Sequence, residues 1–242
     1  GALRHDGRMS APIVLVPGFW LGAWAWDEVA ALLRTDGHDV LAITLPGLES
    51  VETDRSVITM ADHVDAIVEA IESFDRPVVL ALHSGAAVSG FGATDSAADR
   101  IAAVVYIDSF PISGPMNAEF EGAEWALPSW EELEADGNSL EDLSDVTRAT
   151  MVDRSMPEPA AAVREGIGQV GAAALAIPSV LFCTSFPSAE FTGMIDTGSP
   201  WMADLASLEH VTYVDRPTSH WPMFSAPEFT AELLGRVARD LG

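Results

Sequence analysis

The stretch VVLALHSGAAVSG, residues 78–90, decides the fold. Its apolar start, residues 78–82, predicts a buried strand, and residues 86–97 predict a helix rich in small side chains. Ser84 stands at the turn between them. Such a turn lifts a serine hydroxyl out of the strand and aims it above the sheet, while the next N–H, on Gly85, lies at a helix N-terminus that favours negative charge. The pattern predicts a nucleophilic Ser84; an ordinary serine N-cap is the alternative.

Strand and helix patterns alternate on both sides of this stretch. Continuous apolar strands separated by helices are typical of a parallel sheet that is covered on both faces. We therefore expect an α/β fold with a mostly parallel sheet of about six strands. The predicted strands are residues 13–16, 40–45, 78–82, 103–107, 180–184 and 211–214, and the clearest further helices are 24–34, a helix capped by Thr59, and 227–241.

One segment, from about Ile112 to Ala176, interrupts the alternation. It is rich in acids and prolines, and it carries helical patches but no predicted strand. It leaves from the end of the 103–107 strand, the rim at which parallel sheets form their pockets. We expect a helical cap insertion over Ser84, with a solvated excursion as the alternative. Residues 9–242 are predicted to form one domain, preceded by an added or disordered tail of residues 1–8.

The composition excludes several classes of function. There are 37 acidic and 12 basic residues, so the net charge is −25, and no residue is Lys. Lysine Schiff-base chemistry and a lysine phosphate loop are thereby excluded, and the single Cys183 excludes a disulfide framework. So negative a surface disfavours nucleic acids and anionic membranes as partners. The absence of Lys fits either salt adaptation or Arg-favouring codon usage.

Location and cofactors are predicted from missing patterns. No apolar run approaches the ~18 residues of a spanning helix, and the N-terminus lacks the apolar core of a signal peptide, so we expect a cytoplasmic protein. No histidine pair or acidic cluster has metal-ligand spacing, so we expect no metal and no cofactor. A homodimer is compatible with these observations.

Two further motifs flank the sheet pattern. PGFWLGAWAW, residues 17–26, follows the first strand, and PTSHWPMFSAPEF, residues 217–229, follows the last. Together with the stretch of residues 78–90, in which a strand runs through HSG into a helix, these two motifs resemble the α/β-hydrolase superfamily. The resemblance is closest to its small methyl-esterase and hydroxynitrile-lyase branch. The resemblance implies an α/β-hydrolase fold with His220 as the base and with the N–H groups of Phe19 and Gly85 as oxyanion donors.

The chain departs from the superfamily pattern in three places. The usual G-x-S-x-G has glycines where Leu82 and Ala86 stand, and Pro17 replaces a histidine. Because the backbone supplies the oxyanion donor, the change at Pro17 leaves that donor available. Leu82 and Pro17 are the two departures that favour a catalytically weak protein as an alternative.

The acid of the triad is predicted to be Asp108. The superfamily more often places this acid after the strand that corresponds to residues 180–184, but TSFPSAEF offers no Asp at the strand end. Some lipases and lactonases of the superfamily carry the acid one strand earlier, where YIDSFP places Asp108. Glu190 and Asp196 are the alternative acids, and an Asp108 that only caps a turn is the alternative role.

These features predict a serine hydrolase, without cofactor, that cleaves a carboxylic ester or lactone of a small apolar or aromatic molecule. A hydroxynitrile lyase is one alternative, with Arg216 as the only cation near the motifs. A catalytically weak binding protein on the same scaffold is the other. The substrate is expected to contact the aromatic and sulfur side chains of Trp20, Trp125, Trp130, Trp221 and Met223.

Overall fold

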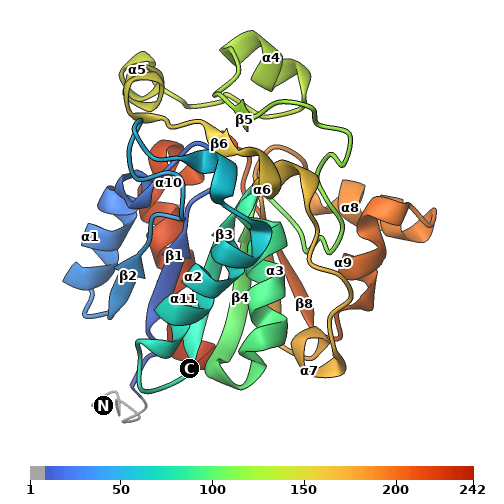
Figure 1. Ribbon diagram of the computed structural model, residues 1–242. Helices are drawn as coiled ribbons and strands as arrows, with labels where there is room; N and C mark the ends of the chain where they lie inside the picture. Colours follow the sequence, from blue (N-terminus) through green and yellow to red (C-terminus); the bar gives the residue numbers. More distant parts are fainter. Residues whose placement is uncertain (1–8) are drawn as a thin grey trace.

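The structure is a computed structural model that describes residues 9–242, so the predicted tail of residues 1–8 lies outside the described residues. The predicted parallel sheet is confirmed: it has six strands in the order β2-β1-β3-β4-β7-β8, and every pair is parallel. Figure 1 shows it at the centre of the molecule. Its strands are β1 (Ile13–Val16), β2 (Val40–Ala42), β3 (Val78–His83), β4 (Ile101–Ile107), β7 (Ser179–Cys183) and β8 (Val211–Asp215).

Helices cover both faces of the sheet, each over its own apolar core. The helices α1 (Asp27–Thr35) and α11 (Pro227–Leu241) pack with one set of strand side chains, and α2 (Met60–Glu72) and α3 (Ala86–Ser96) pack with the alternate set. This division follows from the alternation of side chains along a strand. The other helices outside the segment between β4 and β7 are η1 (Ala23–Trp26), η2 (Arg55–Val57), η3 (Ala98–Arg100), α8 (Ser188–Asp196), η4 (Pro200–Met202), α9 (Ala203–Ser207) and α10 (Pro222–Ser225).

Local signals set several boundaries. Thr59 caps α2 as predicted, because its hydroxyl accepts the Asp62 N–H at 3.1 Å while the Asp62 carboxylate accepts the Thr59 N–H at 2.8 Å. The strand predicted over residues 40–45 is shorter and ends at Ala42. The helix predicted over residues 24–34 begins as the 3₁₀ turn η1 before α1.

The segment between β4 and β7 holds β5 (Glu124–Trp125), α4 (Trp130–Ala135), α5 (Asp145–Arg154), β6 (Glu158–Pro159), α6 (Ala160–Arg164) and α7 (Ala172–Leu175). Two expectations about it need correction. It does contain strands: β5 and β6 pair antiparallel, and two residues each are too short to give a sequence pattern. The last part of the segment does not lie over the carboxyl ends of the strands, where the cap was expected. Its final helix, α7, lies at the amino ends of the strands, because the parallel strand β7 must start there (Figure 1).

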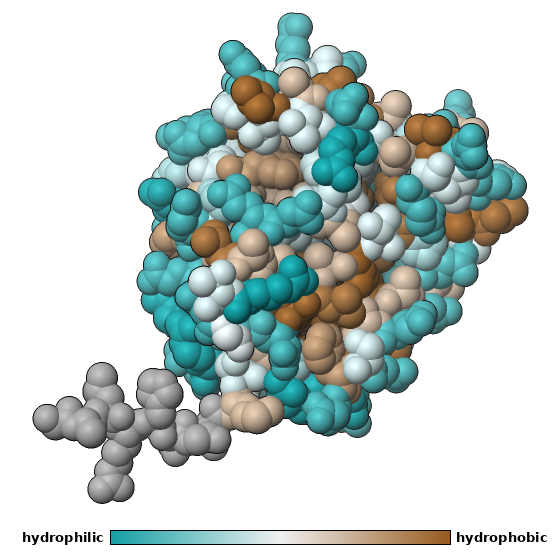
Figure 2. Space-filling view, turned by 90° about the vertical axis from the view of Figure 1, so that its left-hand side faces the viewer, coloured by the Kyte–Doolittle hydropathy of each residue, from teal (hydrophilic) through white to brown (hydrophobic). Residues whose placement is uncertain are grey.

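The surface is mixed in hydropathy. Figure 2 shows a face on which hydrophilic side chains surround smaller apolar patches. Within residues 9–242, no helix is both long and apolar enough to cross a bilayer.

Gly90 explains how the chain accommodates Leu82 before the serine turn. Leu82 is fully buried on β3, and its side chain occupies the space that a Cβ at Gly90 of α3 would need. The glycine usually found on the strand is thus replaced by one on the helix, and the close approach of helix to strand is preserved. The two residues are therefore a matched pair.

This pairing predicts a compensating double substitution. Gly90→Ala alone is expected to lower the free energy of unfolding by about 1–3 kcal/mol through overpacking against Leu82. In a Leu82→Ala background, the same change fills space and costs less. Denaturant midpoints of the two single variants and the double variant measure the coupling. Additive effects would contradict the pairing.

Candidate active site

Ser84 occupies a strained turn between β3 and α3. Its φ is +50°, in the left-handed region that a residue with a side chain rarely adopts. The turn is held by hydrogen bonds from the Ser84 N–H to the Ile107 carbonyl at 3.2 Å and from the Ala87 N–H to the Ser84 carbonyl at 3.0 Å. The hydroxyl is therefore presented at the carboxyl end of the sheet, as the sequence pattern indicates.

The structure brings Ser84, His220 and Asp108 together. His220 Nε2 lies 2.7 Å from Ser84 Oγ, and its Nδ1 lies 2.6 Å from Asp108 Oδ2. The pattern of partners assigns the proton to Nδ1, which donates to the carboxylate, and leaves Nε2 to accept from the serine hydroxyl. This order of groups is the one that activates a serine for nucleophilic attack.

Asp108 is held as a carboxylate at the end of β4. Burial alone would raise its pKa, but hydrogen bonds from His220 and Ser185, with the charge on His220, outweigh burial and hold the pKa of Asp108 well below its usual range. The N–H groups of Thr184 and Ser185 both donate to Oδ1 at 2.9 Å, and the Ser185 hydroxyl donates to Oδ2 at 2.6 Å. The side chain is thus fixed to orient the imidazole.

Ser185 is a site residue that sequence reasoning missed. It follows β7, the position at which the superfamily more often carries its acid, and here it supports Asp108 from the neighbouring strand. The Ser185 hydroxyl oxygen also accepts the backbone N–H of Ser139. The backbone carbonyl of Ser139 in turn accepts the backbone N–H of His220 at 2.8 Å. No pattern in TSFPSAEF marks this supporting role. Of the alternative acids, Glu190 and Asp196 both lie on α8, and neither bonds to His220.

His83 anchors the loop that carries His220. Its Nε2–H donates to the His220 carbonyl at 2.7 Å, deep in the protein. Burial lowers the pKa of His83 to about 3, so the ring is neutral at physiological pH. The ring fits because residue 18 is glycine, at which a Cβ would lie 2.6 Å from His83 Nδ1.

Phe19 and Gly85 present backbone donors beside Ser84. Within residues 9–242, neither N–H donates to another backbone or side-chain group, so both are available to a ligand. The Phe19 ring lies directly on Gly85, where it occupies the place of a Cβ. It also contacts the rings of Trp20 and Trp125 edge to face, with centroids 5.9 and 5.8 Å away. Backbone N–H groups without a protein partner, close to a nucleophile, are what an oxyanion hole requires.

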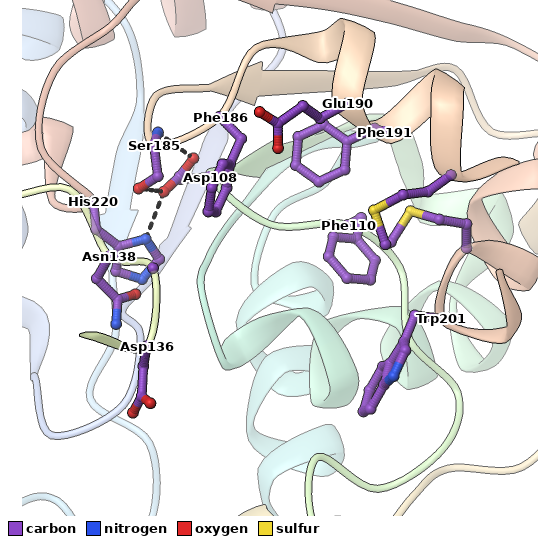
Figure 3. Close-up of a pocket in the computed structure, with 13 residues that line it drawn as sticks. Asp108, Phe110, Asp136, Asn138, Ser185, Phe186, Glu190, Phe191, Trp201 and His220 are labelled. Atoms are coloured by element: carbon purple, nitrogen blue, oxygen red, sulfur yellow. Dashed lines mark hydrogen bonds and ion pairs between the residues drawn. The ribbon is translucent and has the colours of Figure 1, made fainter. Parts of the chain in front are cut away.

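A cavity of about 310 Å³ opens beside His220 and Asp108. Figure 3 shows Phe110, Phe191 and Trp201 on one side of it and His220 with Asn138 on the other. Phe186 and the carboxylates of Asp136 and Glu190 also border it, as do the sulfur atoms of two methionines. The sequence signal for this lining was the pair of phenylalanines in TSFPSAEF. The complete lining is Asp108, Phe110, Asp136, Gly137, Asn138, Ser185, Phe186, Glu190, Phe191, Met194, Trp201, Met202 and His220.

The side chains predicted to contact substrate lie elsewhere, and none of the five lines this cavity. Trp221 and Met223 are buried in the core, because the chain turns inward immediately after His220. Trp130 packs edge to face on Trp221, with centroids 5.9 Å apart. Trp20 and Trp125 contact each other, 4.9 Å apart, behind the Phe19 ring.

Two other predictions about the site concern cations and metals. Arg216 is exposed, and its guanidinium lies over the Phe229 ring, 5.4 Å from the centroid, rather than in the cavity. Among residues 9–242, no three His, Cys, Asp or Glu side chains converge as metal ligands would.

Comparisons with known proteins agree with the fold. A family model described as "Alpha/beta hydrolase family" matches residues 13–233. Among solved structures, an extracellular alpha/beta-hydrolase from a Paenibacillus species has a TM-score of 0.72 at 21% identity, over 95% of this chain and 100% of that one. A methylesterase from Arabidopsis has a TM-score of 0.69 at 16% identity, over 94% of this chain and 99% of that one.

Sequence relatives are named for ester hydrolysis. Methylesterase 7 of Arabidopsis thaliana is 34% identical over 46% of this chain and 45% of its own length. The carbendazim hydrolyzing esterase of Nocardioides sp. (strain SG-4G) is 33% identical over 41% of this chain and 42% of its own length. These alignments span less than half the length of the curated relatives they match.

Proposed function

The chain belongs to the alpha/beta hydrolase family, and from that premise we propose that it is a serine hydrolase that cleaves a carboxylic ester or lactone with an apolar or aromatic group. One observation carries the proposal. Ser84, in its left-handed turn, is hydrogen-bonded to His220, which is hydrogen-bonded to a buried Asp108. The relatives named as esterases support the reaction type.

In the proposed reaction, Ser84 Oγ attacks the ester carbonyl and His220 Nε2 takes its proton. Asp108 stabilises the resulting imidazolium, and the N–H groups of Phe19 and Gly85 bind the oxyanion. The tetrahedral intermediate collapses, and Nε2 returns the proton to the leaving alcohol. A water molecule then attacks the acyl-serine with His220 as base, which releases the acid and restores Ser84. The reaction consumes one water and needs no cofactor.

The cavity, which borders His220 and Asp108 but not Ser84, favours an apolar leaving group. Because His220 must protonate the leaving oxygen, the alcohol portion lies on the His220 side, and the cavity borders His220. Its phenylalanine, tryptophan and methionine side chains favour an apolar or aromatic alcohol. The carboxylates of Asp136 and Glu190 on its border disfavour an anionic one.

The alternatives of other classes have less support. A hydroxynitrile lyase of this type needs a cationic or polar group near the nitrile, and Arg216, the only cation near the motifs, lies over the Phe229 ring and does not line the cavity. A catalytically weak binding protein remains distinguishable by experiment, because it predicts ligand binding without turnover.

A fluorophosphonate probe tests the proposal. The probe phosphonylates an activated serine, so we expect one adduct, located on Ser84 by peptide mass spectrometry. In parallel, a panel of aromatic methyl esters, aryl acetates and lactones should show turnover that the probe abolishes. Folded protein that gives neither an adduct nor turnover would place the chain with the binding proteins.

A further inference from the structure

Trp20 follows the proposed oxyanion donor Phe19 and is held by three hydrogen bonds, all to the segment inserted between β4 and β7. Its N–H donates to Glu158 Oε2 at 2.8 Å, its indole Nε1–H donates to the Trp125 carbonyl at 2.9 Å, and its carbonyl accepts the Met156 N–H at 2.9 Å. Trp20 has a φ of +67°, a conformation that a tryptophan does not hold without such support.

Among the three partners of Trp20, Glu158 is the only side chain. It lies on β6 and is 2% exposed. Burial raises the pKa of Glu158 to about 8, although the Trp20 N–H and the charge of Arg55 both act to lower it. At neutral pH the carboxyl is therefore mainly protonated, and it accepts the Trp20 N–H without a buried negative charge.

The charged groups near Glu158 come from two elements. Arg55 of η2 is 7% exposed and donates to the carbonyls of Pro157 at 2.9 Å, Ser50 at 2.6 Å and Thr53 at 3.2 Å. Its guanidinium lies 3.6 Å from the Glu124 carboxylate of β5, which is half exposed. Arg55 is thus occupied by backbone carbonyls and by Glu124, and it leaves Glu158 bonded to Trp20.

The position of this carboxyl suits the proposed chemistry. Trp20 N–H belongs to the peptide next to the one that carries the Phe19 N–H, so Glu158 lies close to where an oxyanion would form. An apolar side chain here would leave a buried N–H without a partner, which a folded protein avoids. A fixed negative charge here would repel the oxyanion. A neutral hydrogen-bond acceptor avoids both costs.

We propose, on the basis of the function argued above, that Glu158 is a positioning residue of the oxyanion hole: it fixes Trp20, and through Trp20 it holds the Phe19 N–H toward the reacting carbonyl. The inserted segment thereby helps to position the catalytic machinery. The Phe19 ring contacts the Trp20 ring on one side and Gly85 on the other.

Three variants separate positioning from simple stability. Glu158→Leu removes the acceptor, and we expect kcat and the rate of fluorophosphonate labelling to fall about 10- to 100-fold, with KM changed less than about threefold, because misplacing one oxyanion donor acts on the transition state. Glu158→Gln keeps an uncharged acceptor, and we expect it to restore kcat at neutral pH. Glu121→Gln, at an exposed position of the same inserted segment, is the matched control and should behave as the wild type.

The pH profile gives an independent readout. As the pH rises through about 8, the wild-type carboxyl ionises and kcat should fall, whereas Glu158→Gln should keep its kcat at high pH. Stability follows the same ionisation. Because the folded pKa lies above that of the unfolded chain, the contribution of Glu158 is fully present below about pH 4.5 and is lost as the pH rises to about 8. The denaturant midpoint of Glu158→Gln should therefore rise relative to the midpoint of the wild type as the pH increases from about 4.5 to about 8.

The outcomes distinguish this inference from the function on which it rests. Wild-type protein that is not labelled overturns the serine hydrolase itself. If the wild type is labelled, and if Glu158→Leu folds and is labelled at the same rate, only the proposed role of Glu158 is overturned. Should Glu158→Leu not fold, the comparison of wild type with Glu158→Gln decides, and identical pH profiles of kcat would overturn the proposal.

Discussion

Ser84→Ala is expected to lower kcat for ester hydrolysis by about 10⁶-fold and to abolish fluorophosphonate labelling. The magnitude follows from the chemistry, because without Oγ no acyl-enzyme forms and His220 has no hydroxyl to activate. Stopped assays on an aryl ester, with the intact mass of the probe-treated protein, measure both losses. Stability should stay close to that of the wild type, since alanine keeps the Cβ that strains the left-handed turn and therefore does not relieve it.

Ser89→Ala is the matched control for this experiment. Ser89 is a buried serine of α3, five residues beyond the turn, and its hydroxyl donates weakly to the Ala86 carbonyl at 3.4 Å. It should keep wild-type activity and labelling. Residual turnover in Ser84→Ala comparable to that of Ser89→Ala would exclude Ser84 as the nucleophile.

The sheet and the serine turn could be predicted because their signals are local. Continuous apolar runs mark each buried strand, and the small residues after Ser84 mark a helix that must pass close to the sheet. His220 could be predicted from its place between the last strand and the last helix. In each case, a few neighbouring residues determine where the backbone places the side chain.

The rest of the site depends on contacts between distant segments. Ser185 acts on Asp108, 77 residues away in sequence, and Glu158 acts on Trp20, 138 residues away. Neither contact leaves a pattern in its own segment. The predicted substrate contacts illustrate the same difficulty: Trp221 and Met223 adjoin His220 in sequence, but both side chains are buried in the core at the short helix α10. Proximity along the chain was a poor guide to proximity in the site.

Asp108→Asn is expected to lower kcat by about 10⁴-fold while the protein stays folded. The Asn oxygen can still accept the N–H groups of Thr184 and Ser185, but its amide would face His220 Nδ1 as a donor. The imidazole proton is then driven to Nε2, where it faces Ser84 Oγ and prevents that nitrogen from accepting the serine proton. The measurement is kcat on an aryl ester, with the denaturant midpoint as the check on folding.

The control for the acid is Glu190→Gln, which alters a carboxylate on the border of the same cavity without touching His220. We expect it to change KM modestly and to leave kcat within about threefold of the wild type, since it removes no interaction specific to the transition state. An active Asp108→Asn together with an inactive Glu190→Gln would assign the acid to α8. The opposite result would assign it to Asp108, immediately after β4, where Ser185 and two backbone N–H groups hold the carboxylate ionised and aimed at His220.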